Sequence, residues 1–112
     1  MEIGQYNIVL VNLNPGTDEA SQGAEIRQIR PCVVISPDEL NHHLRTIVIA
    51  PMTTRSRPYP TRVRVRHQKK TGWIVVDQIT TIDRKRVLSM VGSLTNPEIR
   101  RLKEIIRETY VE

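Results

Sequence analysis

The chain has 112 residues, of which 17 are lysine or arginine and 12 are aspartate or glutamate, so its formal net charge at pH 7 is +5. This length fits one domain over residues 1–112, and the positive charge favours a polyanionic partner, nucleic acid before membrane. No apolar run approaches the roughly 18 residues that a membrane-spanning helix needs, and residues 1–4 lack a basic or apolar leader. We therefore expect a cytoplasmic protein.

The first third of the chain predicts two strands joined by a long loop. Residues 6–13 are rich in aliphatic and β-branched side chains and stop at an Asn-Pro-Gly turn. Residues 16–30 have no clean period, so they predict a loop that delivers Arg30 to the next strand. That strand, residues 32–35, is apolar on both faces, which favours a buried core role for the single cysteine, Cys32.

A short helix and a third strand are predicted next. Ser36, Pro37 and Glu39 have the spacing of a capping box, with Ser36 as the cap. Residues 46–52 then predict a strand. Pro51 cannot donate a ladder hydrogen bond, so it indicates an edge position or a bulge near the end of this strand.

The second half of the chain predicts more strands and a closing helix. Residues 61–66 alternate, which places the valines inward and the arginines outward. A turn, a strand, a tight helical turn and another strand follow, over residues 67–72, 73–77, 83–86 and 87–94. Thr95 and Glu98 form a second capping box, and apolar residues at helical spacing up to Tyr110 predict an amphipathic helix that packs on the sheet.

Several classes of site are not supported by the sequence. His42 and His43 are adjacent and so point apart, while His67 lies in a basic turn, and none has a cysteine or carboxylate at metal-ligand spacing. No glycine-rich phosphate loop and no serine or cysteine nucleophile motif is present. The histidines are expected on solvated loops, although imidazole also serves ribonucleases as an acid or base.

The remaining polar residues stand at the ends of predicted strands. Arg30 precedes one strand, Thr53 ends another, and Asp77 and Gln78 end a third, so they can share one rim. A guanidinium, a hydroxyl and a carboxylate beside a basic loop suit a phosphodiester, because arginine grips phosphate oxygens in pairs. An ion pair between Arg30 and either Asp77 or Glu25 explains the same residues without catalysis.

Residues 23–36 (GAEIRQIRPCVVIS) resemble the Gly-Ser-Glu-x-x-x-x-Arg-Pro-x-x-Val-hydrophobic-Ser signature of the MazF/PemK-like toxins. Four other segments are similar to pieces of that family in the same order, namely residues 8–15, 48–53, 57–60 and 73–83. The resemblance therefore covers nearly the whole chain.

The resemblance implies a mainly β fold with α, an SH3-like small β-barrel of the PemK/CcdB type closed by the C-terminal helix. It also implies a homodimeric, metal-independent endoribonuclease toxin that needs no cofactor. In that family the 2′-hydroxyl of single-stranded RNA attacks the adjacent phosphorus and leaves a 2′,3′-cyclic phosphate. The catalytic arginine and threonine fall on Arg30 and Thr53, and Glu25 matches a glutamate that some members use, a plausible base. The implied partner is an antitoxin with an acidic disordered segment.

Residues around these positions are candidates for RNA binding. They are Thr54, Arg55, Arg57, Tyr59, Arg62, Asp77 and Gln78. Arginine suits phosphates and tyrosine suits stacking on an unpaired base.

The chain also departs from the family pattern. The loop before Glu25 is longer than usual, and Val75 stands where some members have a catalytic arginine, so the identity of the general acid stays open.

Two other functions remain alternatives. A DNA gyrase-poisoning toxin has the same fold, but such proteins resemble one another in a Trp-Gly-Ile ending, whereas residues 109–112 read Thr-Tyr-Val-Glu. A non-catalytic SH3-like nucleic-acid-binding module explains the charge without any convergence of Glu25, Arg30 and Thr53.

Overall fold

The fold is described from a computed structural model over residues 1–13 and 28–111. Its strands are β1 (Asn7–Asn12), β2 (Ile29–Val34), β3 (Thr46–Thr53), β4 (Arg62–His67), β5 (Lys70–Val75), β6 (Thr80–Asp83) and β7 (Val87–Ser93). The helices are α1 (Asp38–His43) and α2 (Asn96–Ile106), which continues into a π-helical turn (Arg107–Val111), and two short 3-10 turns span Val76–Gln78 and Arg84–Arg86.

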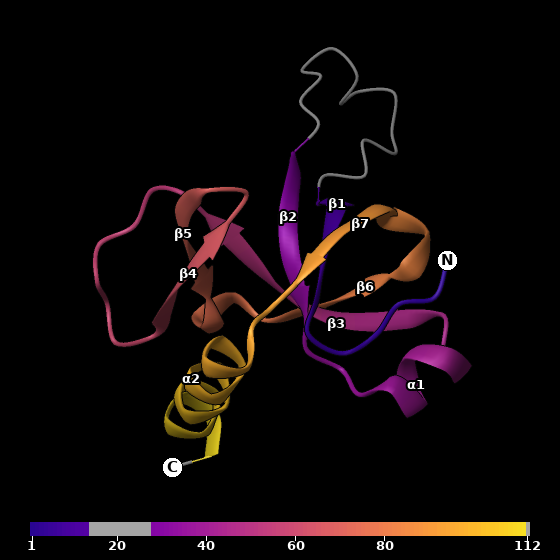
Figure 1. The fold of residues 1–112 in the computed structure, drawn as a ribbon. Coiled ribbons are helices and arrows are strands. Elements are labelled where there is room, and N and C mark those ends of the chain that lie inside the picture. The colour runs from indigo at the N-terminus through magenta and orange to yellow at the C-terminus, as the bar shows by residue number, and fades with distance from the viewer. Residues whose placement is uncertain (14–27, 112) are drawn as a thin grey trace, which may run out of the picture.

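The strands form one strongly curled antiparallel sheet in the order β4-β5-β3-β2-β1-β7, with β6 also paired to β3. Strand β3 is shared because its first half, up to Ile49, pairs with β6, and its last two residues, Met52 and Thr53, pair with β5. The sheet bends between these halves into a half-barrel (Figure 1). The predicted fold class, a small β-barrel with a C-terminal helix, is confirmed.

The central strands bury side chains on both faces. Along β1, Ile8 belongs to one core and its neighbour Val9 to the other, and Val33 and Cys32 divide in the same way on β2. A strand covered on both sides loses the alternation of apolar and polar residues, which explains the continuous apolar run at this point in the sequence. Cys32 is completely buried, as predicted.

Helix α2 covers one of these cores. Leu102 and Ile105 are buried against the cluster that contains Val63 and Val65 of β4, and Figure 1 shows the helix lying beneath β4 and β5. The predicted capping box is present, because Thr95 accepts from the Glu98 N–H and the Glu98 carboxylate accepts from the Thr95 N–H. The Tyr110 hydroxyl then donates to the Val76 carbonyl oxygen at 2.7 Å.

Three predicted elements differ from the structure. Strand β2 begins at Ile29, so Arg30 lies inside the strand rather than at the end of a loop. Strand β6 was not predicted, since four residues with only one buried side chain give little periodic signal. The turn predicted over residues 67–72 is shorter in the structure, because β4 runs to His67 and β5 starts at Lys70.

The expectations for Pro51 and Ser36 were wrong in their details. Strand β3 is central, with β2 on one side. On its other side, Pro51 falls between the residues that pair with β6 and those that pair with β5, so the missing N–H of Pro51 removes no ladder hydrogen bond there. Helix α1 begins after Pro37 without a side-chain cap. The Ser36 hydroxyl instead donates to buried Asn41 and accepts from the Val48 N–H, which ties α1 to β3.

Candidate functional site

Two adjacent pockets share one wall. The larger has a volume of about 530 Å³ and the smaller about 310 Å³, and both are lined by Arg30, Thr53 and Arg55. The larger pocket is completed by Pro31, Met52, Thr54, His67, Gln68, Lys70, Thr71 and Gly72. The smaller pocket is completed by Leu13, Gln28, Pro51, Arg62, Val75 and Gln78.

Strand pairing explains why Arg30 and Thr53 meet. Strands β2 and β3 are antiparallel, with Cys32 opposite Pro51. The ladder ends at this pair, and Arg30, two residues before Cys32, and Thr53, two residues after Pro51, both line the two pockets. On its other side, Thr53 pairs with Trp73 of β5. The hydroxyl is therefore held by β3, which pairs with three other strands, and the arginine by its neighbour β2.

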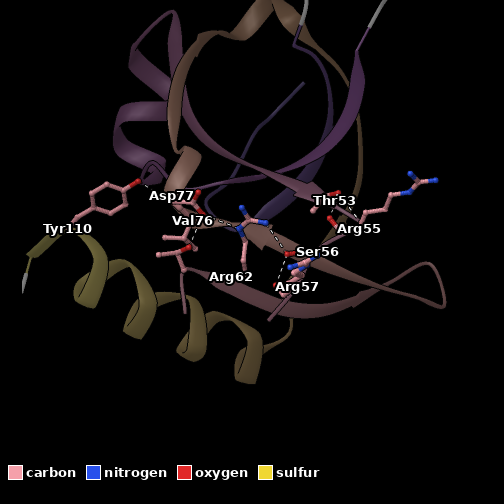
Figure 2. Close-up of polar contacts among 9 residues, drawn as sticks. Thr53, Arg55, Ser56, Arg57, Arg62, Val76, Asp77 and Tyr110 are labelled. Atoms are coloured by element: carbon pink, nitrogen blue, oxygen red, sulfur yellow. Dashed lines mark hydrogen bonds and ion pairs between the residues drawn. The ribbon is translucent and has the colours of Figure 1, made fainter. Parts of the chain in front are cut away.

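The Thr53 hydroxyl also shapes the chain that follows it. It accepts from the Arg55 N–H at 3.1 Å and lies 3.2 Å from the Arg55 carbonyl oxygen, to which it donates. Such a local turn fixes the hydroxyl at the pocket wall. Figure 2 shows the Arg55 side chain extending from this turn away from the polar residues around Arg62.

Arg30 is exposed, and within residues 1–13 and 28–111 its guanidinium has no hydrogen bond or ion pair. Its charge reaches the neighbouring thiol, where burial raises the pKa of Cys32 to about 12 and the positive charge of Arg30 partly opposes that rise. Cys32 is therefore a protonated core residue at neutral pH, as the sequence predicted. Glu25, the predicted base, lies outside the described residues.

Arg62, by contrast, is held from three sides. Its Nε donates to the Asp77 carboxylate at 3.0 Å, its Nη1 donates to the Ser56 hydroxyl at 2.9 Å, and its Cζ lies 5.2 Å from the centre of the Tyr59 ring. The Thr61 hydroxyl donates to the same Asp77 oxygen at 2.9 Å. Figure 2 shows Arg62 between Asp77 and Ser56. We call Ser56, Tyr59, Thr61, Arg62 and Asp77 the Arg62 cluster.

The Arg62 cluster decides between two possible ion-pair partners of Asp77. The sequence allowed Arg30, but the structure pairs Asp77 with Arg62. The hydrogen bond from Arg62 is the main cause that holds the pKa of Asp77 below its usual value, with the Thr61 hydroxyl adding to it. The Asp77 carboxylate is thus an ion-pair partner of Arg62 at the edge of the smaller pocket.

The comparisons with known proteins agree with the fold and with the order of these elements. Residues 4–110 match the model of the family described as PemK-like, MazF-like toxin of type II toxin–antitoxin system. The chain belongs to this family. Its members are generally known as endoribonucleases.

Solved structures of MazF toxins have the same fold. The Mycobacterium tuberculosis toxin MazF-mt6 is 20% identical, with a TM-score of 0.76 over 93% of this chain and 95% of that one. The MazE-MazF complex (Form-II) from Deinococcus radiodurans is 20% identical, with a TM-score of 0.80 over 97% and 96%. An endoribonuclease in complex with its cognate antitoxin from Mycobacterial species is 19% identical, with a TM-score of 0.77 over 95% and 92%.

The residues predicted to bind RNA in this PemK/MazF-like toxin divide into two groups. Thr54 lines the larger pocket, Arg62 and Gln78 line the smaller, and Arg55 lines both. The side chains of Arg57, Tyr59 and Asp77 line neither pocket, although all three are exposed. Val75, which stands where some members have an arginine, is buried at the wall of the smaller pocket opposite Arg62.

Sequence reasoning missed the tip of the β4–β5 hairpin. His67, Gln68 and Lys70 line the larger pocket together with Arg30 and Thr53. The basic sequence of the tip was visible, but its place depends on the bend of β3, which brings β5 beside Thr53. Within residues 1–13 and 28–111, no three metal-binding side chains cluster and no helix is long and apolar enough to cross a membrane.

Proposed function

We propose that this toxin-family member is a sequence-specific, metal-independent endoribonuclease that cleaves single-stranded RNA. The proposal is supported by the shared wall of the two pockets, which Arg30 and Thr53 both line. A guanidinium and a hydroxyl at one wall between two open pockets suit a phosphodiester with a nucleoside on either side.

The proposed reaction starts from the substrate's own nucleophile. The 2′-hydroxyl attacks the adjacent phosphorus, the bond from phosphorus to the 5′-oxygen breaks, and the products are a 2′,3′-cyclic phosphate and a 5′-hydroxyl. Negative charge builds on the non-bridging oxygens in the transition state. The Arg30 guanidinium donates to those oxygens in a bidentate fork, and the Thr53 hydroxyl adds a donor once its proton turns from the Arg55 carbonyl oxygen to the phosphate.

Two proton transfers complete this reaction. We propose that Glu25 accepts the proton of the 2′-hydroxyl, an assignment that comes from the family resemblance alone. Arg30 is the candidate that stabilises and protonates the leaving 5′-oxygen. Because Val75 stands where some members have an arginine, our proposal gives this part of the mechanism to Arg30.

The surroundings of the wall support a single-stranded substrate. Thr54, Arg55 and Gln78 offer donors inside the pockets, and exposed Arg57 and Tyr59 follow Thr53 along the chain. Unpaired bases can stack on an aromatic ring, while arginines bind the phosphates between them.

The proposed assembly is a cytoplasmic homodimer bound by a cognate antitoxin. An acidic, disordered segment of the antitoxin suits a chain with a net charge of +5 and competes with RNA for the basic wall. Affinity for such a segment should fall as the salt concentration rises, because exposed charges are screened.

Incubation of the purified protein with a mixed-sequence RNA and a chelator tests the reaction. We expect fragments with 2′,3′-cyclic phosphate and 5′-hydroxyl ends, and we expect Arg30→Ala to lose them while the exposed Arg100→Ala variant keeps them. Binding without cleavage would favour the non-catalytic module. Inhibition of gyrase-driven DNA supercoiling, with intact RNA, would favour the gyrase poison.

A further inference from the structure

The larger pocket contains a histidine that the proposed reaction does not use. His67 ends β4 at the hairpin tip and lines this pocket together with Arg30 and Thr53. Its side chain is half-buried, and it has no hydrogen bond to any residue among 1–13 and 28–111. A neutral imidazole has one donor and one acceptor, so this ring keeps both available for a ligand.

The imidazole is positioned by the opposite edge of the sheet. Its Cε1 lies 3.4 Å, and its Nδ1 3.7 Å, from the point that a Cβ atom on Gly92 would occupy. Gly92 belongs to β7, the last strand in the order in which β4 is the first. The imidazole therefore packs against the backbone at Gly92, where the two edges of the curled sheet approach each other. This packing holds the ring at the pocket wall.

The hairpin tip that carries His67 has an unusual backbone. Gln68 and Lys69 have φ values of 53° and 64°, the left-handed region that glycine and asparagine normally fill in a two-residue hairpin turn. Each non-glycine residue there costs free energy, and such residues persist where other constraints hold them. Because Gln68 also lines the larger pocket, the tip presents polar side chains to it where glycine would present none.

The rest of the pocket has the chemistry of a base site. Pro31, Met52 and Gly72 give it an apolar wall, while His67 and Gln68 give it polar groups that can read a base edge. Its volume of about 530 Å³ is within the roughly 300–1,000 Å³ typical of small-ligand pockets. Stacking on a histidine ring and hydrogen bonds to base edges are the usual means of reading single-stranded RNA.

We infer that the larger pocket binds the nucleobase on one side of the scissile phosphate and that His67 is a specificity-determining residue that contacts this base. The inference rests on the proposed nuclease function and adds to it the residue and the pocket that select the cut sequence. Gln68 acts from the same tip as the second polar contact. The smaller pocket, lined by Gln78, receives the nucleotide on the other side of the phosphate.

The test is cleavage of an RNA pool with a randomised segment, followed by sequencing of the fragment ends. His67→Ala is expected to lose base preference at one position next to the cut and to lower kcat/KM on the preferred sequence by about tenfold or more. His42→Ala, at an exposed position on α1 that lines neither pocket, is the matched control and should keep both. Gln68→Ala, at the exposed tip, should relax the same position if His67→Ala does not fold.

A second measurement uses the unmodified protein. An RNA of the preferred sequence, with a deoxyribose at the cut so that no attack occurs, should shift the imidazole NMR signals of His67 and leave those of His42 in place. Unchanged preference and rate in both tip variants, together with unmoved His67 signals, would overturn the inference while the nuclease proposal stands. A wild-type protein that leaves RNA intact would overturn both.

Discussion

Arg30 and Arg62 are two of the three arginines that line the smaller pocket, and their surroundings differ in kind. Arg62 donates to Asp77 and Ser56 and lies against Tyr59, with only 15% of its side chain exposed. Arg30 is exposed and has no partner within residues 1–13 and 28–111. The charge of Arg62 is thus compensated inside the protein, while that of Arg30 is open toward the space shared by both pockets.

These contacts indicate that Arg30 is suited to chemistry and Arg62 to structure. A guanidinium already paired with a carboxylate must give up that pair before it can bind two phosphate oxygens. The free energy of the lost ion pair then offsets most of the free energy gained from the phosphate. Arg30 has no such competitor among residues 1–13 and 28–111. Arg30 should therefore affect rate with little effect on stability, and Arg62 should do the reverse.

The largest expected effect comes from Arg30→Ala. Removal of one preorganised donor to a developing charge costs on the order of 10²–10³ in rate. We expect that loss in single-turnover cleavage, with a Tm close to that of the wild type. Arg30→Lys keeps the charge but not the bidentate fork, so it should restore only part of the rate. A large drop in Tm for Arg30→Ala would instead show a structural role for this arginine.

Thr53→Val should have the next largest effect. It keeps the shape of the side chain and removes the hydroxyl, and a hydrogen bond to a charged group is worth about 1.5–3 kcal/mol, which corresponds to a loss of roughly 10- to 100-fold in rate. Thr53→Ser should recover most of the activity, since the hydroxyl and its turn with Arg55 both remain. Equal rates for Thr53→Val and the wild type would remove Thr53 from the proposed mechanism.

Much of the fold was readable from the chain because local rules and tertiary packing agree there. The capping box at Thr95 and the inward valines of β4 are local signals, and the structure keeps both. The errors fall where packing decides. Ser36 looks like a helix cap, but its hydroxyl is used by Asn41 and Val48. Pro51 looks like an edge residue, but it sits at the change of partner along β3.

The candidate site was readable only in part. The sequence placed Arg30 and Thr53 at strand ends, and the register of β2 and β3 explains their shared wall. It gave no means to choose the partner of Asp77, because Arg62 and Arg30 are equally plausible from spacing. It also missed His67, whose place depends on the curl that brings the β4 and β7 edges together.

Arg62→Ala should change stability more than chemistry. Among the described residues, the variant leaves Asp77 with Thr61 as its one side-chain partner, and it removes the guanidinium that lies over the Tyr59 ring. With Asp77 partly exposed and screened by solvent, we expect a loss of about 1 kcal/mol in the free energy of unfolding. Arg64→Ala, on the same strand and exposed, is the control and should stay near the wild type. A rate loss in Arg62→Ala as large as that in Arg30→Ala would erase the distinction between the two arginines.

The smallest expected effect is a loss of stability at low pH that comes from the Arg62 cluster. The pKa of Asp77 is lower in the folded chain than in the unfolded chain, first because of the hydrogen bond from Arg62. Its contribution is therefore complete above the usual aspartate pKa and is lost as the pH falls through the lowered folded value. Since Asp77 is 36% exposed, the difference should be roughly a few tenths of a kcal/mol.

Urea unfolding between pH 7 and pH 3 can detect this contribution in the wild type, Asp77→Asn and Arg62→Ala. Both variants should lose less stability over this range than the wild type, and to a similar extent, because each removes the interaction that lowers the pKa. Arg30→Ala should follow the wild type curve, since Asp77 pairs with the other arginine. If Arg30→Ala flattened the curve instead, Asp77 would be coupled to Arg30 in solution, and the charge of Arg30 would be compensated within the protein after all.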